Sequence, residues 1–426
     1  MDRDGLRVVP EASPQAGAPA AGVRRSSFRA LHSRPFRIYF AGQVVSASGS
    51  FLQATAIGWL VLKLTGSASS LGLVLAAGGV PPLLFGPFGG TVADRVDLRK
   101  LLIVTQTIFG VLAGGLWLLA VAGSAKVAAV VAITVAGGFV QIVDGPARLA
   151  FVSRLVPTED LASAASLNGV VMNSARVVGP ALAGVLIVTV GTTPCFAINA
   201  LSYLAVVGAL IVIRPLDGGV GRAGTGGLRE SLRYARGRQQ LWLPLAMMAL
   251  IGLLSFNFGV IIPVLAKDTF HGSGGTYGLL STMISLGAVL GSLGVGLLAH
   301  PRRPYLIVAS LAFAACLAAT AGSPNVATAS VALLATGGAA FALVTLSSTT
   351  LQLHASPGYR GRIMALWSFV YMGTTPIGTI ITGWITGLGG PRAALLVGAG
   401  ACVAAAVIAM FVHTPPHPDD AFTDLA

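Results

Sequence analysis

The sequence predicts an all-α membrane protein with twelve transmembrane helices in two six-helix pseudo-repeats, and three observations lead to this prediction. Of the 426 residues, 54% are hydrophobic and only 10% are charged, whereas a soluble domain carries about 25% charged residues. Twelve apolar runs have the length of about 20 residues that a spanning helix needs. The loops between these runs alternate in charge, so that 22 of the 27 Lys and Arg residues fall on one side.

The apolar runs follow one another along most of the chain. Runs such as residues 127–139 do not alternate in polarity, as the strands of a lipid-exposed barrel would, so we expect helices. The expected spans are 37–62, 69–92, 101–122, 127–143, 166–189, 194–213, 241–266, 276–299, 304–321, 326–348, 362–388 and 392–412.

The net charge of +13 would suggest a nucleic-acid partner in a soluble protein, but its distribution indicates membrane topology instead. The positive-inside rule predicts that both termini and all even-numbered loops are cytoplasmic, with anionic lipid headgroups as neighbours. We therefore expect membrane lipids, and no nucleic acid, as partners. All three cysteines lie in or beside spans, so no disulfide framework is expected.

The longest internal hydrophilic stretch divides the spans six plus six. Its glycine cluster predicts a flexible linker, and Arg229, Arg233 and Arg236 at helical spacing suggest a short helix on the inner leaflet. The predicted organisation is a disordered cytoplasmic tail (1–36), a first bundle (37–213), a cytoplasmic linker (214–240), a second bundle (241–412) and a second cytoplasmic tail (413–426).

An internal repeat supports this division. Residues 90–95 close the second span and residues 296–301 close the eighth. The pair Arg99-Lys100 then precedes the third span as Arg302-Arg303 precedes the ninth. Such a match at equivalent places in the two halves is typical of transporters built from repeats.

The loop after the second span carries Gly90, Asp94, Arg95, Arg99 and Lys100. It resembles the signature loop of the major facilitator superfamily, in which Gly-x-x-x-Asp-Arg is followed closely by Arg-Lys. Gly90 permits close helix approach, and Asp94 offers a charge that can pair with a basic group or a helix N-terminus. The resemblance implies the major facilitator fold and a latch that closes the two halves on the cytoplasmic side, with the start of the eleventh span near Arg362 as partner. The alternative is a solvated charge cluster that only sets topology.

The fifth span contains Gly179, Pro180 and Gly184, which resemble the Gly-Pro-x-x-x-Gly element of exporters in this superfamily. Pro180 removes a backbone donor, and the two glycines permit close helix packing. We expect Gly287 and Gly291 of the eighth span to form the partner surface. The alternative is that these are ordinary residues of a spanning helix.

Arg176 is the only basic residue near the middle of a span, where a charge costs about 2.5–3.5 kcal/mol. It is either a charge site for an anionic substrate group or for coupling, or a fixed partner of Asp144. Asp144 is the only carboxylate expected on a transport path, and proton coupling requires such a titrating group. Proton-coupled drug exporters often have an arginine in the fourth span and a carboxylate in the first. This chain instead has Gln141 and Gln43 there, so the coupling mechanism stays open.

A polar face runs along the first span, where Gln43, Ser46, Ser50 and Gln53 fall within an arc of about 80°. The resemblance places the first, fourth, seventh and tenth spans around a central cavity. We therefore expect these side chains to line a substrate site together with Gln141, Phe256 and Asn257. The alternative is that the amides join neighbouring helices.

Further segments, at 157–161 and 361–367, resemble the branch containing enterobactin and macrolide exporters. The sequence thus predicts a monomeric secondary transporter that exports a drug, siderophore or other secondary metabolite across the cytoplasmic membrane by alternating access, with proton exchange as one mode of coupling. An importer of the same fold is the nearest rival. A membrane enzyme acting on lipid-linked substrates is disfavoured because the six histidines show no metal-ligand spacing. No P-loop occurs, and neither a metal nor a cofactor is expected.

Overall fold

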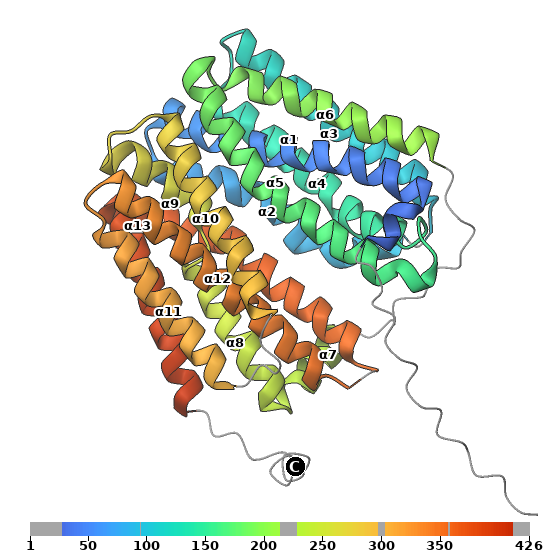
Figure 1. Cartoon of the computed structure of the whole chain (residues 1–426). Coiled ribbons are helices and arrows are strands. Elements are labelled where there is room, and N and C mark those ends of the chain that lie inside the picture. The colour runs from blue at the N-terminus through green and yellow to red at the C-terminus, as the bar shows by residue number, and fades with distance from the viewer. Residues whose placement is uncertain (1–27, 94, 214–227, 297–302, 357, 412–426) are drawn as a thin grey trace, which may run out of the picture.

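The computed structural model describes residues 28–93, 95–213, 228–296, 303–356 and 358–411. Within these ranges the chain forms two helical bundles that lie side by side, coloured blue to green and yellow to red in Figure 1. Eleven of the described helices are long and apolar enough to cross a membrane. The last of them joins two spans, so the predicted twelve-helix fold is confirmed.

The first bundle contains six helices and short 3-10 turns at Arg29–His32 and Thr158–Asp160. The carboxylate of Asp97 begins the third helix by accepting the backbone N–H groups of Arg99 and Lys100 at 2.9 and 3.1 Å. The helices are α1 (Arg34–Thr65), α2 (Ala68–Ala93), α3 (Leu98–Val121), α4 (Val127–Val152), α5 (Leu161–Thr189) and α6 (Thr193–Val212).

The second bundle follows a short helix, α7 (Leu228–Arg236), at the position where the arginine spacing suggests one. Its helices are α8 (Gln239–Leu254), α9 (Phe258–Val264) with a π-helical turn at Leu265–Thr269, α10 (Gly274–Val295), α11 (Arg303–Gly322), α12 (Val326–His354) and α13 (Arg360–Phe411). Gly390 in α13 has φ 78° and ψ 172°, so two spans meet there without a loop.

Two predicted boundaries are wrong. Helix α4 continues to Val152 rather than ending at residue 143, because the Asp144 carboxylate pairs with the Arg148 guanidinium at 2.7 Å and neither charge ends the span. Residues 28–36, predicted as part of a disordered tail, form a 3-10 turn and the start of α1. The remainder of that tail and all of the second tail lie outside the described residues.

The seventh span is broken at Ser255, Phe256 and Asn257, between α8 and α9. The hydroxyl of Ser255 donates to the Gly398 carbonyl at 2.8 Å, and the Asn257 amide donates to the Leu253 carbonyl at 2.8 Å. These bonds satisfy polar groups at a depth where lipid offers no partner. The break therefore lies within the protein, at the middle of the span.

The two bundles repeat one helix-capping contact, made by Arg99 in the first bundle and by Arg303 in the second. The Nε atom of Arg99 donates to the Leu210 carbonyl in the last turn of α6 at 2.6 Å. The Nε atom of Arg303 donates to the Ala409 carbonyl in the last turn of α13 at 3.0 Å. In both bundles a cation thus stabilises the C-terminus of the final helix.

Successive spans run antiparallel, so the loops fall on two faces. The basic face is where α1, α3, α5, α11 and α13 begin, and the opposite face is where α2, α4, α6 and α10 begin. The basic face carries Arg34, Arg37, Arg95, Arg99, Lys100, Arg154, Arg303, Arg360 and Arg362, and the opposite face carries Lys63, Lys126, Lys267 and Arg392.

The bundles meet along a first seam between α2 and α13. A Cβ atom on Gly72 would lie 2.4 Å from the Thr379 carbonyl oxygen, and one on Gly79 would lie 2.6 Å from Pro376. The same face of α2, within an arc of about 60°, also carries Gly86 and Gly90, where an added Cβ would meet nothing within 4 Å. This seam is therefore closed toward the opposite face and open toward the basic face.

A second seam, between α5 and α10, diverges in the same direction. A Cβ atom on Gly184 would lie 2.9 Å from the Gly278 Cα, whereas one on Gly169 would meet nothing within 4 Å. Both glycines lie on one side of α5, within an arc of about 60°. The two bundles therefore form a V whose mouth is at the basic face.

We expect Gly72→Ala to destabilise the protein. The added methyl would force the Thr379 carbonyl away, and overpacking of this kind costs about 1–3 kcal/mol. The matched control is Gly114→Ala in α3, where the methyl would meet nothing within 4 Å and helix propensity improves. Thermal unfolding in detergent should show a lower midpoint for Gly72→Ala only. Equal midpoints for the two variants would contradict the close seam.

Candidate functional site

Arg176 lies on α5 where the seam begins to open. It shares one side of the helix with Gly184, which is packed against α10, and with Gly169, which is not. Its guanidinium carbon is 4.7 Å from the ring centre of Phe341 in α12 and 5.8 Å from that of Phe51 in α1. The Arg176 side chain therefore bridges the two bundles near the middle of the spans.

The guanidinium of Arg176 has no hydrogen bond or ion pair among the described residues, and its buried Nε atom is without a partner. Cation–π contacts of this kind contribute about 0.5–2 kcal/mol, which offsets part of the cost of the buried charge. The expected alternative of a fixed pair with Asp144 is wrong, because Arg148 occupies that carboxylate.

An aromatic wall in the second bundle adjoins Arg176. The ring of Phe256 lies 5.4–6.4 Å from those of Phe313, Phe341 and Tyr371, and Tyr371 stacks on Trp367 at 5.2 Å. We use "aromatic wall" for these five residues, which come from the α8–α9 break, α11, α12 and α13. The Trp367 Nε1 atom is buried without a hydrogen-bond partner. The wall therefore offers ring surface and one unpaired donor.

The remaining cavity candidates outside α1 lie apart from each other. Asn257 is buried, its amide packs against Gly378, and its Oδ1 atom has no hydrogen-bond partner. Gln141 is exposed on α4. Asn257 thus gives the aromatic wall an unpaired hydrogen-bond acceptor next to Phe256, whereas Gln141 lies on the first bundle.

The polar face of α1 is engaged inside the first bundle. The Oε1 atom of Gln53 accepts the Asn199 amide at 2.8 Å, and the Ser50 hydroxyl is 3.2 Å from the Tyr203 hydroxyl. Ser46 is buried, and its carbonyl accepts the hydroxyl of Ser50. In this structure the polar face joins α1 to α6, the alternative that the sequence left open.

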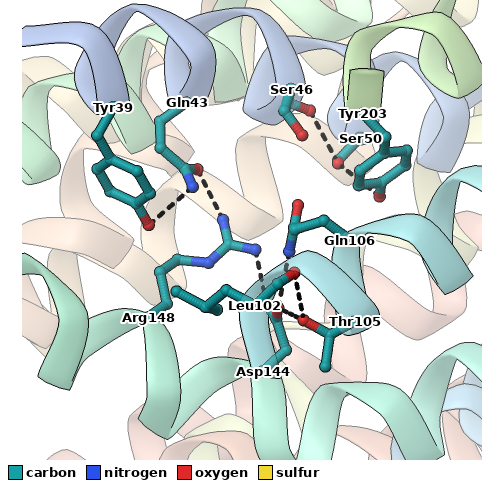
Figure 2. Close-up of polar contacts among 10 residues, drawn as sticks. All are labelled: Tyr39, Gln43, Ser46, Ser50, Leu102, Thr105, Gln106, Asp144, Arg148 and Tyr203. Atoms are coloured by element: carbon teal, nitrogen blue, oxygen red, sulfur yellow. Dashed lines mark hydrogen bonds and ion pairs between the residues drawn. The ribbon is translucent and has the colours of Figure 1, made fainter. Parts of the chain in front are cut away.

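Asp144 is the centre of a buried network that Figure 2 shows. Its Oδ2 atom accepts Arg148 Nη2 at 2.7 Å, and its Oδ1 atom accepts Thr105 Oγ1 and Gln106 Nε2, both at 2.7 Å. The Asp144 side chain is fully buried. Both carboxylate oxygens are thus satisfied, as a buried charge requires.

The network continues from Arg148 to α1. Its Nη1 atom donates to Gln43 Oε1 at 2.8 Å, and Gln43 Nε2 donates to the Tyr39 hydroxyl at 2.8 Å (Figure 2). The chain of bonds therefore ties α1, α3 and α4 together. Sequence reasoning missed Arg148 because it ended the fourth span too early, although the i, i+4 spacing from Asp144 was a usable signal.

The described residues of the predicted latch are not brought together. Asp94 lies outside the described residues, while Arg95 and Lys100 are exposed and Gly90 is in the last turn of α2. Arg99 caps α6 within its own bundle. Thus none of the described members of this loop forms a hydrogen bond or ion pair with the second bundle.

Arg362, the predicted partner, instead contacts α7. Its Nη1 atom donates to Glu230 Oε1 at 2.9 Å, and the Tyr359 hydroxyl donates to the same oxygen at 2.9 Å. This hydrogen bond to a carboxylate raises the pKa of Tyr359. The rings of Tyr234 and Tyr359 also stack at 4.0 Å. Helix α7 therefore binds the start of α13, a contact that the sequence did not predict.

The Gly-Pro element of α5 contacts two helices. Gly179 packs against Phe51 and Leu52 of α1, whereas Gly184 packs against Gly278 of α10. The expected contact with Gly287 and Gly291 is wrong, although both lie in the expected helix. Those two glycines pack against the backbone of α12 at Leu334 and Gly338, because they lie nearer the basic face, where α5 and α10 have separated.

Two six-helix bundles with a buried site at their junction define the class of secondary transporters. The chain matches the model of the transmembrane secretion effector family over residues 25–424 and belongs to that family of major facilitator transporters. It is therefore a multi-span membrane transporter of small molecules, not an enzyme.

Individual relatives agree with this assignment. The enterobactin exporter EntS of Citrobacter koseri is 28% identical over 404 residues, which cover 91% of this chain and 95% of the exporter. Macrolide efflux protein A of Streptococcus pyogenes is 25% identical over 292 residues, covering 65% of this chain and 70% of that protein. The predicted resemblance to the enterobactin and macrolide exporters is confirmed.

Solved structures share the fold. The nucleoside transporter NupG superposes with a TM-score of 0.73 at 14% identity, covering 88% of this chain and 98% of that chain. At such low identity the likeness concerns the architecture alone.

We expect Arg148→Gln to destabilise the first bundle strongly, because it leaves the buried Asp144 carboxylate without its cation, a loss of about 3–5 kcal/mol. The double variant Asp144→Asn/Arg148→Gln removes both charges and should lose less than the single variant. Unfolding in detergent of the two single variants and the double variant forms a double-mutant cycle. Additive losses would show that the two charges do not interact.

Proposed function

We propose that this transporter exports a small organic molecule, such as a drug, siderophore or other secondary metabolite, across the cell membrane by alternating access. The observation that carries the proposal is the V-shaped arrangement of the bundles, with Arg176 and the aromatic wall at its apex. A molecule bound at the apex is accessible from one face only. Rocking of the bundles about the seams would expose it to the other face.

The charge distribution supports an orientation for this cycle. Because 21 of the 27 Lys and Arg residues belong to the termini, the linker between the bundles and the basic face, the positive-inside rule puts the basic face and both chain ends in the cytoplasm. The V then opens toward the cytoplasm, the state in which an exporter takes up its cargo. The relatives named as exporter and efflux protein support the outward direction.

One chain supplies both bundles and the whole apex, which supports a monomer, and its basic face suits anionic headgroups of membrane lipids. Proton exchange is the proposed energy source. Asp144 is the one fully buried carboxylate in the part of the chain that the structure describes, so a titrating step would have to open its contacts with Thr105, Gln106 and Arg148.

The latch is proposed for the state in which the mouth of the V is closed. Gly86 and Gly90 continue the glycine face of α2 toward the basic face, so the backbone of α13 can approach them closely. Asp94 would then lie near the N-terminus of α13, whose peptide dipole favours a carboxylate. Arg362, which now binds Glu230, lies in the first turn of that helix.

Transport by inside-out membrane vesicles tests the direction. With an acid interior, vesicles that contain the protein should accumulate at least one member of a panel of drugs and siderophores, and vesicles without it should not. A protonophore should abolish the accumulation. Uptake by intact cells, with no accumulation in inside-out vesicles, would contradict export and favour an importer.

The variant Asp94→Asn tests the latch. We expect transport to fall by about twofold to thirtyfold, because an Asn side chain lacks the charge that the helix dipole stabilises by about 0.3–2 kcal/mol, while the amount of protein in the membrane stays normal. The matched control is Asp97→Asn in the same loop, since Asn caps a helix as well as Asp and α3 should be unaffected. Normal transport by Asp94→Asn would rule out the latch.

A further inference from the structure

The guanidinium of Arg176 lies against two aromatic rings and makes no hydrogen bond to the described residues. The rings of Phe341 and Phe51 lie over it at 4.7 and 5.8 Å. A guanidinium donates hydrogen bonds only through the five N–H groups in its plane. None of these groups donates to another described residue, and the Nε atom is buried without a partner. The aromatic rings therefore hold the cation in place while its hydrogen-bonding edge is left unpaired.

No charge in the described part of the chain neutralises Arg176. Asp144, the buried carboxylate, pairs with Arg148 at 2.7 Å and accepts two further hydrogen bonds. The other recorded ion pairs involve Arg29 and Arg362 near the basic face. The apex of the V therefore has a net positive charge, and in surroundings of low polarity such a charge attracts an anion strongly.

The aromatic rings beside this charge indicate which chemical group the rest of the ligand carries. Phe341, which covers the Arg176 guanidinium, lies 6.4 Å from Phe256, and Phe256 lies 5.7 Å from Tyr371. Aromatic rings bind other rings in offset or edge-to-face geometry. A carboxylate matches the two parallel donors of a guanidinium edge. The two features lie next to each other at the junction of the bundles.

We propose that the transported molecule is an organic anion built on a planar aromatic ring, with a carboxylate or phenolate bound by the edge of Arg176 and the ring packed on the aromatic wall. The inference rests on the proposed function, because it names the class of cargo for that site. It separates this cargo from neutral apolar drugs and from the aliphatic anions of lipids.

Binding of three related compounds to the purified full-length protein tests the inference by isothermal titration calorimetry in detergent. The compounds are 2-naphthoate, its neutral amide 2-naphthamide, and decanoate, an aliphatic acid. The native protein should bind 2-naphthoate about tenfold or more tightly than either of the others, since a charge-assisted bidentate contact contributes about that factor.

Four variants separate the role of the guanidinium from a general loss of structure. Arg176→Gln should reduce the affinity for 2-naphthoate to that for 2-naphthamide and leave the amide unchanged. Arg176→Lys keeps the charge but lacks the two parallel N–H donors of a guanidinium, so it should give an intermediate affinity for 2-naphthoate. Phe341→Leu should weaken both aromatic compounds. Lys63→Gln, which removes an exposed charge at the opposite face, should change none of the affinities.

Equal binding of 2-naphthoate and 2-naphthamide by the native protein would overturn the inference, and so would decanoate binding as tightly as 2-naphthoate. These comparisons need only the native protein, so they hold even where Arg176→Gln fails to fold. Binding requires no gradient and no direction of transport. Selective, Arg176-dependent binding without export from vesicles would therefore uphold the ligand class and contradict only the proposed export.

Discussion

Contact between the two bundles depends on small residues that bring helix backbones together. Lipid tails are as apolar as the side chains of a spanning helix, so these side chains gain no hydrophobic free energy by moving from lipid to a neighbouring helix. Close packing must therefore hold the helices together. Gly72 and Gly79 on α2, and Gly184 and Gly278 on the other seam, supply this packing toward the opposite face. Because the seams close over only part of their length, the same surfaces also define the mouth of the V and the depth at which Arg176 lies.

The two arginines that lie within spans, Arg148 and Arg176, have different roles because their surroundings differ. Arg148 is four residues from Asp144 and is neutralised by it, and the pair links α1, α3 and α4 through hydrogen bonds. Arg176 has ring faces for neighbours instead of carboxylates. The first arrangement holds one bundle together, and the second leaves a cation at the junction of both.

Movement of the bundles requires that each remains intact while the seams change. Within the first bundle the amides and hydroxyls of α1 bind α6, and the Asp144 network binds α3 and α4. Within the second, Ser255 secures the α8–α9 break to α13, and Glu230 secures α7 to the start of α13. Polar contacts are thus concentrated inside each bundle, whereas glycines and few hydrogen bonds line the seams, a distribution suited to rocking of rigid bodies.

Much of the architecture was predictable from the sequence alone. The number of spans, their repeat and the face that carries most basic residues follow from hydropathy and charge summed along the chain. Such sums depend only on neighbours in the sequence. The basic pairs that precede the third and ninth spans also mark the repeat in the sequence, and one arginine of each pair, Arg99 or Arg303, caps the last helix of its bundle.

Which side of each helix meets which neighbour was decided only by the tertiary structure. The glutamines of α1 turn toward α6 or Arg148, Gly184 meets Gly278 instead of Gly287, and rings from α11, α12 and α13 gather around Phe256. These contacts join residues far apart in the sequence, and each depends on the fit between two particular surfaces. A hydropathy pattern does not depend on the shapes of the packed surfaces. It therefore predicts that Arg176 lies within a span, but not which residues surround it.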